Sequence, residues 1–97
     1  MGNRISEERL EKYLETTRMA LKKVRIACPP RSFGKTIADD FMRMAVSYFE
    51  DAEHFKMKGD LVNAFACVNY AHGWLDCGAR LGIFEVGEDE KLFTLYE

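Results

Sequence analysis

Three long stretches of this sequence place apolar residues three or four positions apart, and this spacing constrains the fold more than any other feature. Residues at these separations share one face of an α-helix, so each stretch predicts an amphipathic helix. Pro29-Pro30, Gly59 and Gly82 separate or end the stretches, as proline and glycine commonly do between helices. The pattern predicts helices at about residues 6–27, 36–58 and 60–82, followed by a short apolar tail at 83–97.

Residues at the expected helix ends support these boundaries. Ser6 and Asp60 are suitable N-caps for the first and third helices, and Thr36 with Asp39 fits a capping box for the second. Because Gly59 alone separates the second segment from the Asp60 cap, these two helices are expected to form an antiparallel hairpin. The fold expected is all-α: an antiparallel up-and-down three-helix bundle with a short apolar C-terminal tail.

The length of the chain indicates one domain. Its 97 residues suffice for a single core, because a chain of this size buries roughly 65% of its unfolded surface on folding. A disordered chain is excluded, since 47% of the residues are hydrophobic. We therefore expect residues 1–97 to form a single helical-bundle domain.

The third segment carries very little charge. Between residues 60 and 82 the formal charges are Asp60, Asp76 and Arg80, and apolar residues lie on nearly every side. Such a helix is expected to be buried. Two neighbouring helices cover one face, so the opposite face needs cover from the tail or from a second molecule. The interface candidates on that opposite face are Tyr70, Trp74, Cys77 and Leu81.

A narrow polar strip runs along the same segment and consists of Asn69, His72, Asp76 and Arg80. Two hypotheses remain open for it. The first is structural: an Asp76–Arg80 ion pair with i,i+4 spacing, and a buried bond to a neighbouring helix. The second is a small recognition or acid–base site. No nucleophile with an adjacent base is visible, so no catalytic residue is assigned and an enzyme is disfavoured.

The histidines and cysteines indicate neither a metal site nor a disulfide framework. His54 and His72 fall at different levels of the expected hairpin, and no two cysteines have CxxC spacing. No metal or other cofactor is therefore predicted. Three free thiols favour a reducing, cytoplasmic location. No apolar run approaches 18 residues and the N-terminal stretch is polar, so neither a membrane span nor a signal peptide is expected.

Positive charge is concentrated between residues 16 and 38, where no Asp or Glu occurs. The net charge of −2 excludes a wholly basic nucleic-acid-binding protein but allows a local basic patch. In an up-and-down bundle these bases are expected at one end and most acids at the other. They could contact phosphates, although no RNA-binding motif accompanies them, or they could complement a helix dipole. The anion or nucleic-acid candidates are Arg18, Lys22, Lys23, Arg25, Arg31 and Lys35.

The stretch from Tyr48 to Phe84 carries the pattern YxxDAxxFxxxGDxxNAFxxxxYAHGWLDxGxRLGxF. This pattern resembles a family of short archaeal proteins classed as domain-of-unknown-function family 357. The resemblance covers most of the chain, with a looser match in the first helix and the tail. It implies an up-and-down three-helix bundle from an archaeon, and it implies no activity.

The function expected from the sequence is a non-catalytic protein–protein interaction or assembly module. Its working surface would be the face of Tyr70, Trp74, Cys77 and Leu81 with the tail, most simply in a homodimer. The alternative is a nucleic-acid-associated protein that uses the basic end around residues 18–35. A third hypothesis is a small enzyme with a site at His72 and Asp76.

Overall fold

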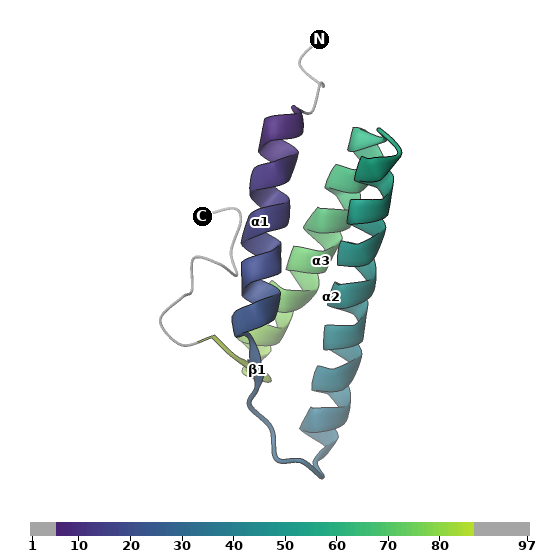
Figure 1. Ribbon diagram of the computed structural model, residues 1–97. Coiled ribbons are helices and arrows are strands. Elements are labelled where there is room, and N and C mark those ends of the chain that lie inside the picture. Colours follow the sequence, from purple (N-terminus) through teal and green to yellow (C-terminus); the bar gives the residue numbers. More distant parts are fainter. Residues whose placement is uncertain (1–5, 87–97) are drawn as a thin grey trace.

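Three helices form the molecule in the computed structural model, which describes residues 6–86 (Figure 1). Helix α1 spans Glu7–Lys23, α2 spans Phe33–Met57 and α3 spans Leu61–Leu81. Strands β1 (Arg25–Ile26) and β2 (Phe84–Glu85) form a small antiparallel sheet. The prediction of an all-α, antiparallel up-and-down bundle is confirmed. Most of the predicted tail, residues 87–97, lies outside the described residues.

The caps predicted for α1 and α3 are present. The Ser6 hydroxyl accepts a hydrogen bond from the Arg9 amide at 3.1 Å, and Asp60 accepts one from the Asn63 amide at the same distance. Gly82 ends α3 in the left-handed conformation, with φ of 80°. These contacts satisfy backbone groups that a helix end leaves without intrahelical partners.

The prediction that the first helix reaches residue 27 is wrong. Helix α1 ends at Lys23 because Val24 is extended and the next two residues form β1. In that strand Ile26 pairs with Phe84, and the Ala27 amide donates to the Ile83 carbonyl at 2.9 Å. The apolar spacing did not show this, since the same residues also fit a helical face.

The predicted start of the second helix at Thr36 is also wrong. Helix α2 begins at Phe33, and Ser32 is its N-cap, with its hydroxyl accepting a hydrogen bond from the Lys35 amide at 3.1 Å. The same hydroxyl donates to the Pro29 carbonyl at 2.7 Å. Thr36 therefore lies inside the first turn and caps nothing, although its spacing to Asp39 fits a capping box.

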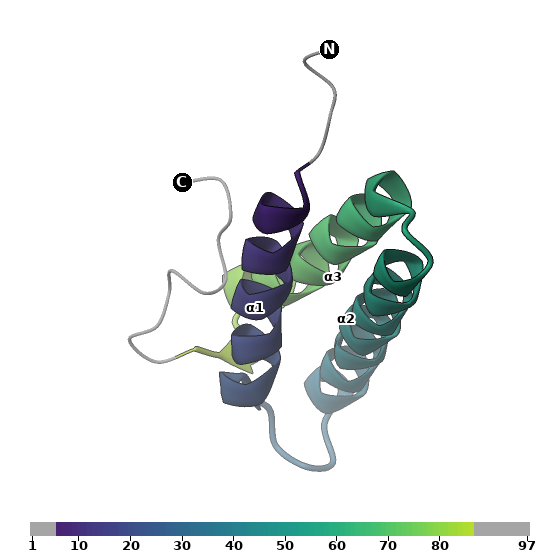
Figure 2. The same cartoon turned by 45° about the horizontal axis from the view of Figure 1, so that its top comes forward.

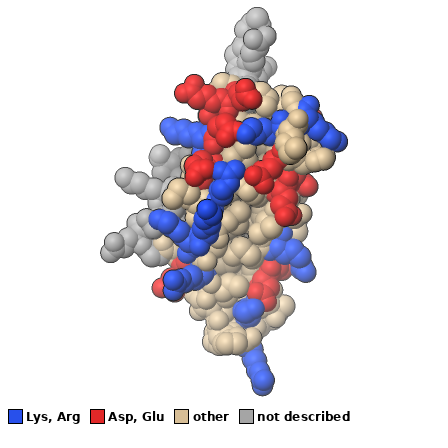
Figure 3. Space-filling view, in the orientation of Figure 1, with Lys and Arg blue, Asp and Glu red and all other residues tan. Residues whose placement is uncertain are grey.

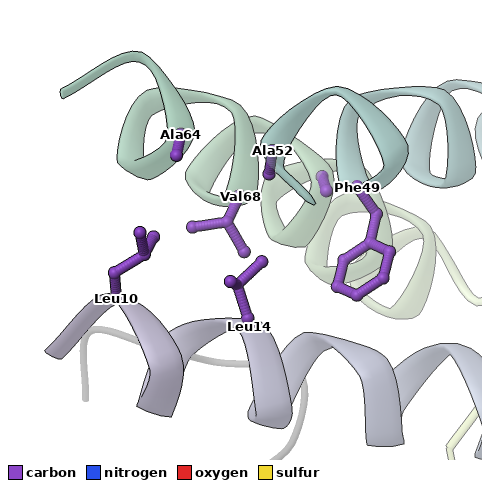
Figure 4. Packing of buried hydrophobic residues seen from close by; sticks show 7 residues of the cluster. Leu10, Leu14, Phe49, Ala52, Ala64 and Val68 are labelled. Carbon is purple, nitrogen blue, oxygen red and sulfur yellow. The ribbon is translucent and has the colours of Figure 1, made fainter. Parts of the chain in front are cut away.

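Helix α3 packs against both other helices (Figure 2). One core cluster lies between the three helices, near the end where α2 turns into α3; its leucine, valine and phenylalanine side chains pack against small alanines (Figure 4). The alanines allow the helices to approach closely. The cluster comprises Leu10, Leu14, Phe49, Ala52, Ala64, Val68 and Ala71. A second cluster, nearer the sheet, comprises Ala20, Ala38, Ala45, Leu75 and Phe84.

Candidate functional site

Trp74 is partly covered by helix α2. Its ring meets the ring of Phe41 edge to face, with centroids 4.9 Å apart, and both side chains pack against the second core cluster. Helix α2 therefore supplies part of the cover that we expected from the tail or from a second molecule, and most of that tail lies outside the described residues. The large indole lies on the side of α3 that faces α2 and reaches a partner within the described bundle.

The other side of α3 carries a row of exposed residues without formal charge, with the exposed Arg80 beside it. We call it the outer α3 stripe: Val62, Ala66, Tyr70, Gly73, Cys77 and Leu81 are all exposed along one side of the helix. Of the large side chains, Val62 is 64% exposed, Tyr70 61% and Leu81 62%. Three of the four predicted interface residues therefore lie on an open surface, and Trp74 is half-buried beside them.

Tyr70 is positioned by helix α2. Its ring lies 5.3 Å from that of Tyr48 in a tilted arrangement. Such a contact limits the freedom of the side chain while more than half of its surface stays open. The stripe thus presents a supported aromatic ring near its centre, as interface anchors commonly do.

The predicted polar strip does not form one site. His72 is buried between α1 and α3 at 3% exposure, where its Nδ1 atom lies 3.4 Å from the Thr17 hydroxyl oxygen. Arg80 donates from Nε to both oxygens of Asp76 at 3.2 Å on the surface. The Asn69 side-chain amide donates to the carbonyl of Phe65 at 3.1 Å on its own helix. The arrangement separates a core residue, His72, from surface polar groups.

No metal site is formed by the described residues. Within 6–86 there is no group of three or more His, Cys, Asp or Glu side chains that could hold a metal ion. His54 is exposed on α2, whereas His72 is buried beside α1, so the two histidines face different surroundings.

The predicted separation of bases and acids into opposite ends is only partial. Arg18 lies level with the C-terminal half of α2 and pairs with Glu53 at 3.2 Å. Helix α1 has 17 residues and α2 has 25, so α1 runs along only part of α2. Lys35 pairs with Asp39 at 2.6 Å. In Figure 3 acidic side chains gather toward the upper half of the molecule, while basic ones are spread along its whole length. Of the remaining candidates, Lys22, Lys23, Arg25 and Arg31 are exposed.

The three cysteines are free thiols in different surroundings. Cys77 is exposed on the outer α3 stripe, and Cys67 is half-buried. Burial raises the pKa of the Cys67 thiol above its ordinary value, and the nearby carboxylates of Asp51 and Asp60 raise it further. Cys77 is therefore the more accessible of the two.

Two glycines of α3 have opposite surroundings. A methyl group at Gly78 would lie 2.2 Å from the ring of Phe84, so the close packing of β2 on α3 requires glycine. At Gly73 a methyl group would meet no atom of the described residues within 4 Å. Packing within the described residues thus explains why residue 78 is glycine, but it gives no reason for glycine at position 73.

Sequence reasoning missed several of these features. Val62, Ala66 and Gly73 belong to the exposed stripe, and Thr17 is the polar residue beside His72. The signal for the first three was present in their helical spacing from Tyr70 and Cys77. No signal in the sequence placed Thr17 opposite His72, because the level of α1 along α3 depends on tertiary packing.

The fold and the surface define a small three-helix bundle with a row of exposed uncharged residues along one helix. The chain belongs to the family described as Protein of unknown function (DUF357), whose family model matches residues 12–84. That range takes in all of α2 and α3 and ends at Phe84, the residue packed on Gly78. Comparisons with curated proteins and with solved structures found no match. None of the helices in residues 6–86 has the length and apolar character needed to cross a membrane.

Proposed function

We propose that this protein is a non-catalytic protein–protein interaction or assembly module that binds through the outer α3 stripe. The observation that carries the proposal is the exposure of Val62, Tyr70 and Leu81, each above 60%, on one helix face. Apolar side chains gathered on one surface commonly mark an interaction site, whereas single exposed ones need no explanation. Burying them against a partner would contribute about 25 cal/mol per Å² of apolar area.

The contacts of the charged residues favour this proposal over nucleic-acid binding. Arg18 and Lys35, two of the six basic candidates, already pair with carboxylates of the same chain. The surroundings of His72 favour it over catalysis, since a ring at 3% exposure beside Thr17 offers little access to a substrate.

We further propose that the protein acts in the cytoplasm of an archaeal cell. Three free cysteines, one of them exposed, support a reducing compartment. The archaeal source is supported by the resemblance of the Tyr48–Phe84 pattern to a family of short archaeal proteins.

Site-specific photo-crosslinking tests the proposed surface without knowledge of the partner. A photoreactive benzoylphenylalanine replaces Tyr70 in one variant and Ser47 in a control, in the cells that produce the protein. Ser47 is exposed on α2, away from the stripe. We expect discrete cross-linked species from position 70 and none from position 47. Equal labelling from both positions, or none from position 70, contradicts the proposal.

A further inference from the structure

We propose that the outer α3 stripe binds the same stripe of a second copy of this chain, with the two α3 helices antiparallel. The two-fold axis of this dimer passes between Ala71 and His72. This inference rests on the proposed function and names its partner.

The spacing of the stripe is the first support. Its successive steps are four, four, three, four and four residues, and they read the same from either end. A two-fold interface requires that residue i of one copy meets residue j of the other while j meets i. An antiparallel pair centred between residues 71 and 72 meets this requirement along the whole stripe. The facing positions are then Val62 with Leu81, Ala66 with Cys77 and Tyr70 with Gly73.

The size of the facing residues is the second support. Tyr70, the largest residue of the stripe, falls opposite Gly73, the smallest. A glycine inside a helix costs about 1 kcal/mol relative to alanine, and packing within the described residues gives no reason for it at position 73. In the dimer the bare backbone of Gly73 receives the ring of Tyr70 from the second copy, and the two rings lie on either side of the axis.

Charge is the third support. The stripe itself has no formal charge, and the flanking Asp76 carboxylate already accepts hydrogen bonds from Arg80, so two identical faces do not repel each other. The antiparallel register also places Arg80 opposite Asn63 of the second copy, one turn from the Asp60 carboxylate. The Arg80 cation near the C-terminus of α3 thus approaches the N-cap carboxylate of Asp60 in its neighbour.

The small area of the stripe indicates a weak dimer. A helix of 21 residues is about 31 Å long and about 10 Å wide. One such face is smaller than the roughly 800 Å² per partner found in stable complexes. We therefore infer a reversible dimer with a dissociation constant on the order of 10 to 100 µM.

Disulfide trapping tests the register. The variant Ala66→Cys places a thiol opposite Cys77 of the second copy, and mild oxidation should join the two positions. In the wild type the two Cys77 thiols lie about 16 Å apart along the helix axis, too far for a disulfide. The double variant Ala66→Cys with Cys77→Ser is the matched control, since its thiols at position 66 are equally far apart. Mass spectrometry of the linked peptides identifies the bond.

Sedimentation velocity of the reduced wild type, from about 10 µM to about 1 mM, accompanies the trapping. In sedimentation we expect a dimer whose fraction rises with concentration. In the trapping experiment we expect a disulfide between positions 66 and 77 in Ala66→Cys. We expect no disulfide through Cys77 in the wild type and none through position 66 in the control. A monomer throughout this range overturns the inference. So does a dimer without the 66–77 link. If position 70 nevertheless photo-crosslinks to another protein, the inference fails while the proposed function stands.

Discussion

The ring of Phe84 packs on the bare backbone of Gly78, where a methyl group would lie 2.2 Å from the ring. Phe84 is 3% exposed and also belongs to β2, which pairs with the β1 strand that follows α1. One contact thus joins the ends of α1 and α3. Because it depends on a single absent methyl group, it allows a sharp mutational test.

We expect Gly78→Ala to lower the free energy of unfolding by about 1–3 kcal/mol. Overpacking against Phe84 has a cost of this size, and it outweighs the gain of about 1 kcal/mol in helix propensity. Urea unfolding followed by circular dichroism measures the change. An increase in stability would show that Phe84 moves away at little cost.

Gly73→Ala should have the opposite effect on the monomer. Its methyl group meets no described atom within 4 Å, so the helix-propensity gain of up to about 1 kcal/mol remains. Unfolding is measured at a few micromolar, where the proposed dimer is dissociated. A loss of stability would show that position 73 is already packed within the chain.

Gly73→Leu should keep the fold and weaken self-association by at least about tenfold, or about 1.4 kcal/mol. The first atom of the added side chain meets no atom of the described residues within 4 Å, and in the proposed dimer the side chain occupies the space of the second copy's Tyr70. Sedimentation velocity measures the dimer, with Ser47→Leu on α2 as the control. Unchanged association of Gly73→Leu would contradict the close approach of two α3 helices at this residue.

Thr17→Val should destabilise the bundle by about 1–2 kcal/mol, because it removes a buried hydroxyl that lies beside the His72 ring while conserving volume. Thr16→Val is the control, since the Thr16 hydroxyl donates only to the Lys12 carbonyl of its own helix near the surface. Urea unfolding compares the two variants. Equal effects would show that the Thr17–His72 contact adds nothing beyond a local change in helix propensity.

Cys77 should react with iodoacetamide faster than Cys67 at pH 8, as measured by peptide mass spectrometry. Cys67 is less exposed, and its raised pKa lowers the fraction of reactive thiolate. The raised pKa also predicts the sign of a pH effect: the folded state disfavours the thiolate, so stability falls as pH rises through the pKa of Cys67. The variant Cys67→Ala should reduce this alkaline loss. Faster alkylation of Cys67 would contradict its half-buried position.

The sequence allowed most of the architecture to be predicted. Helical spacing and the caps at Ser6 and Asp60 are local properties, so the number, order and direction of the helices followed from them. The end of α1 at Lys23 and the start of α2 at Phe33 could not be predicted in this way. Strand pairing of Ile26 with Phe84 overrides the helical spacing, and capping by Ser32 replaces the capping box expected at Thr36.

Less of the candidate site could be predicted. The low charge of the third helix correctly indicated unusual apolar surface, and Tyr70, Cys77 and Leu81 lie on it. The rotation of α3 against its neighbours depends on tertiary packing. For that reason Trp74 was placed on the open face, although it packs on Phe41. The contacts of Asp76 and His72 are those of the structural hypothesis for the polar strip, whose partner residue Thr17 was not foreseen.

Sedimentation velocity of the wild type and of the Tyr70→Lys/Leu81→Lys variant tests the central claim most directly. Thr36→Lys/Ser47→Lys is the matched control, since it adds the same charge at exposed positions of α2. From about 10 µM to about 1 mM, the wild type and the control should shift from monomer to dimer, while the stripe variant stays monomeric and folded. A stripe variant that dimerises as strongly as the wild type, or a wild type that remains monomeric at about 1 mM, would contradict self-association through the outer α3 stripe.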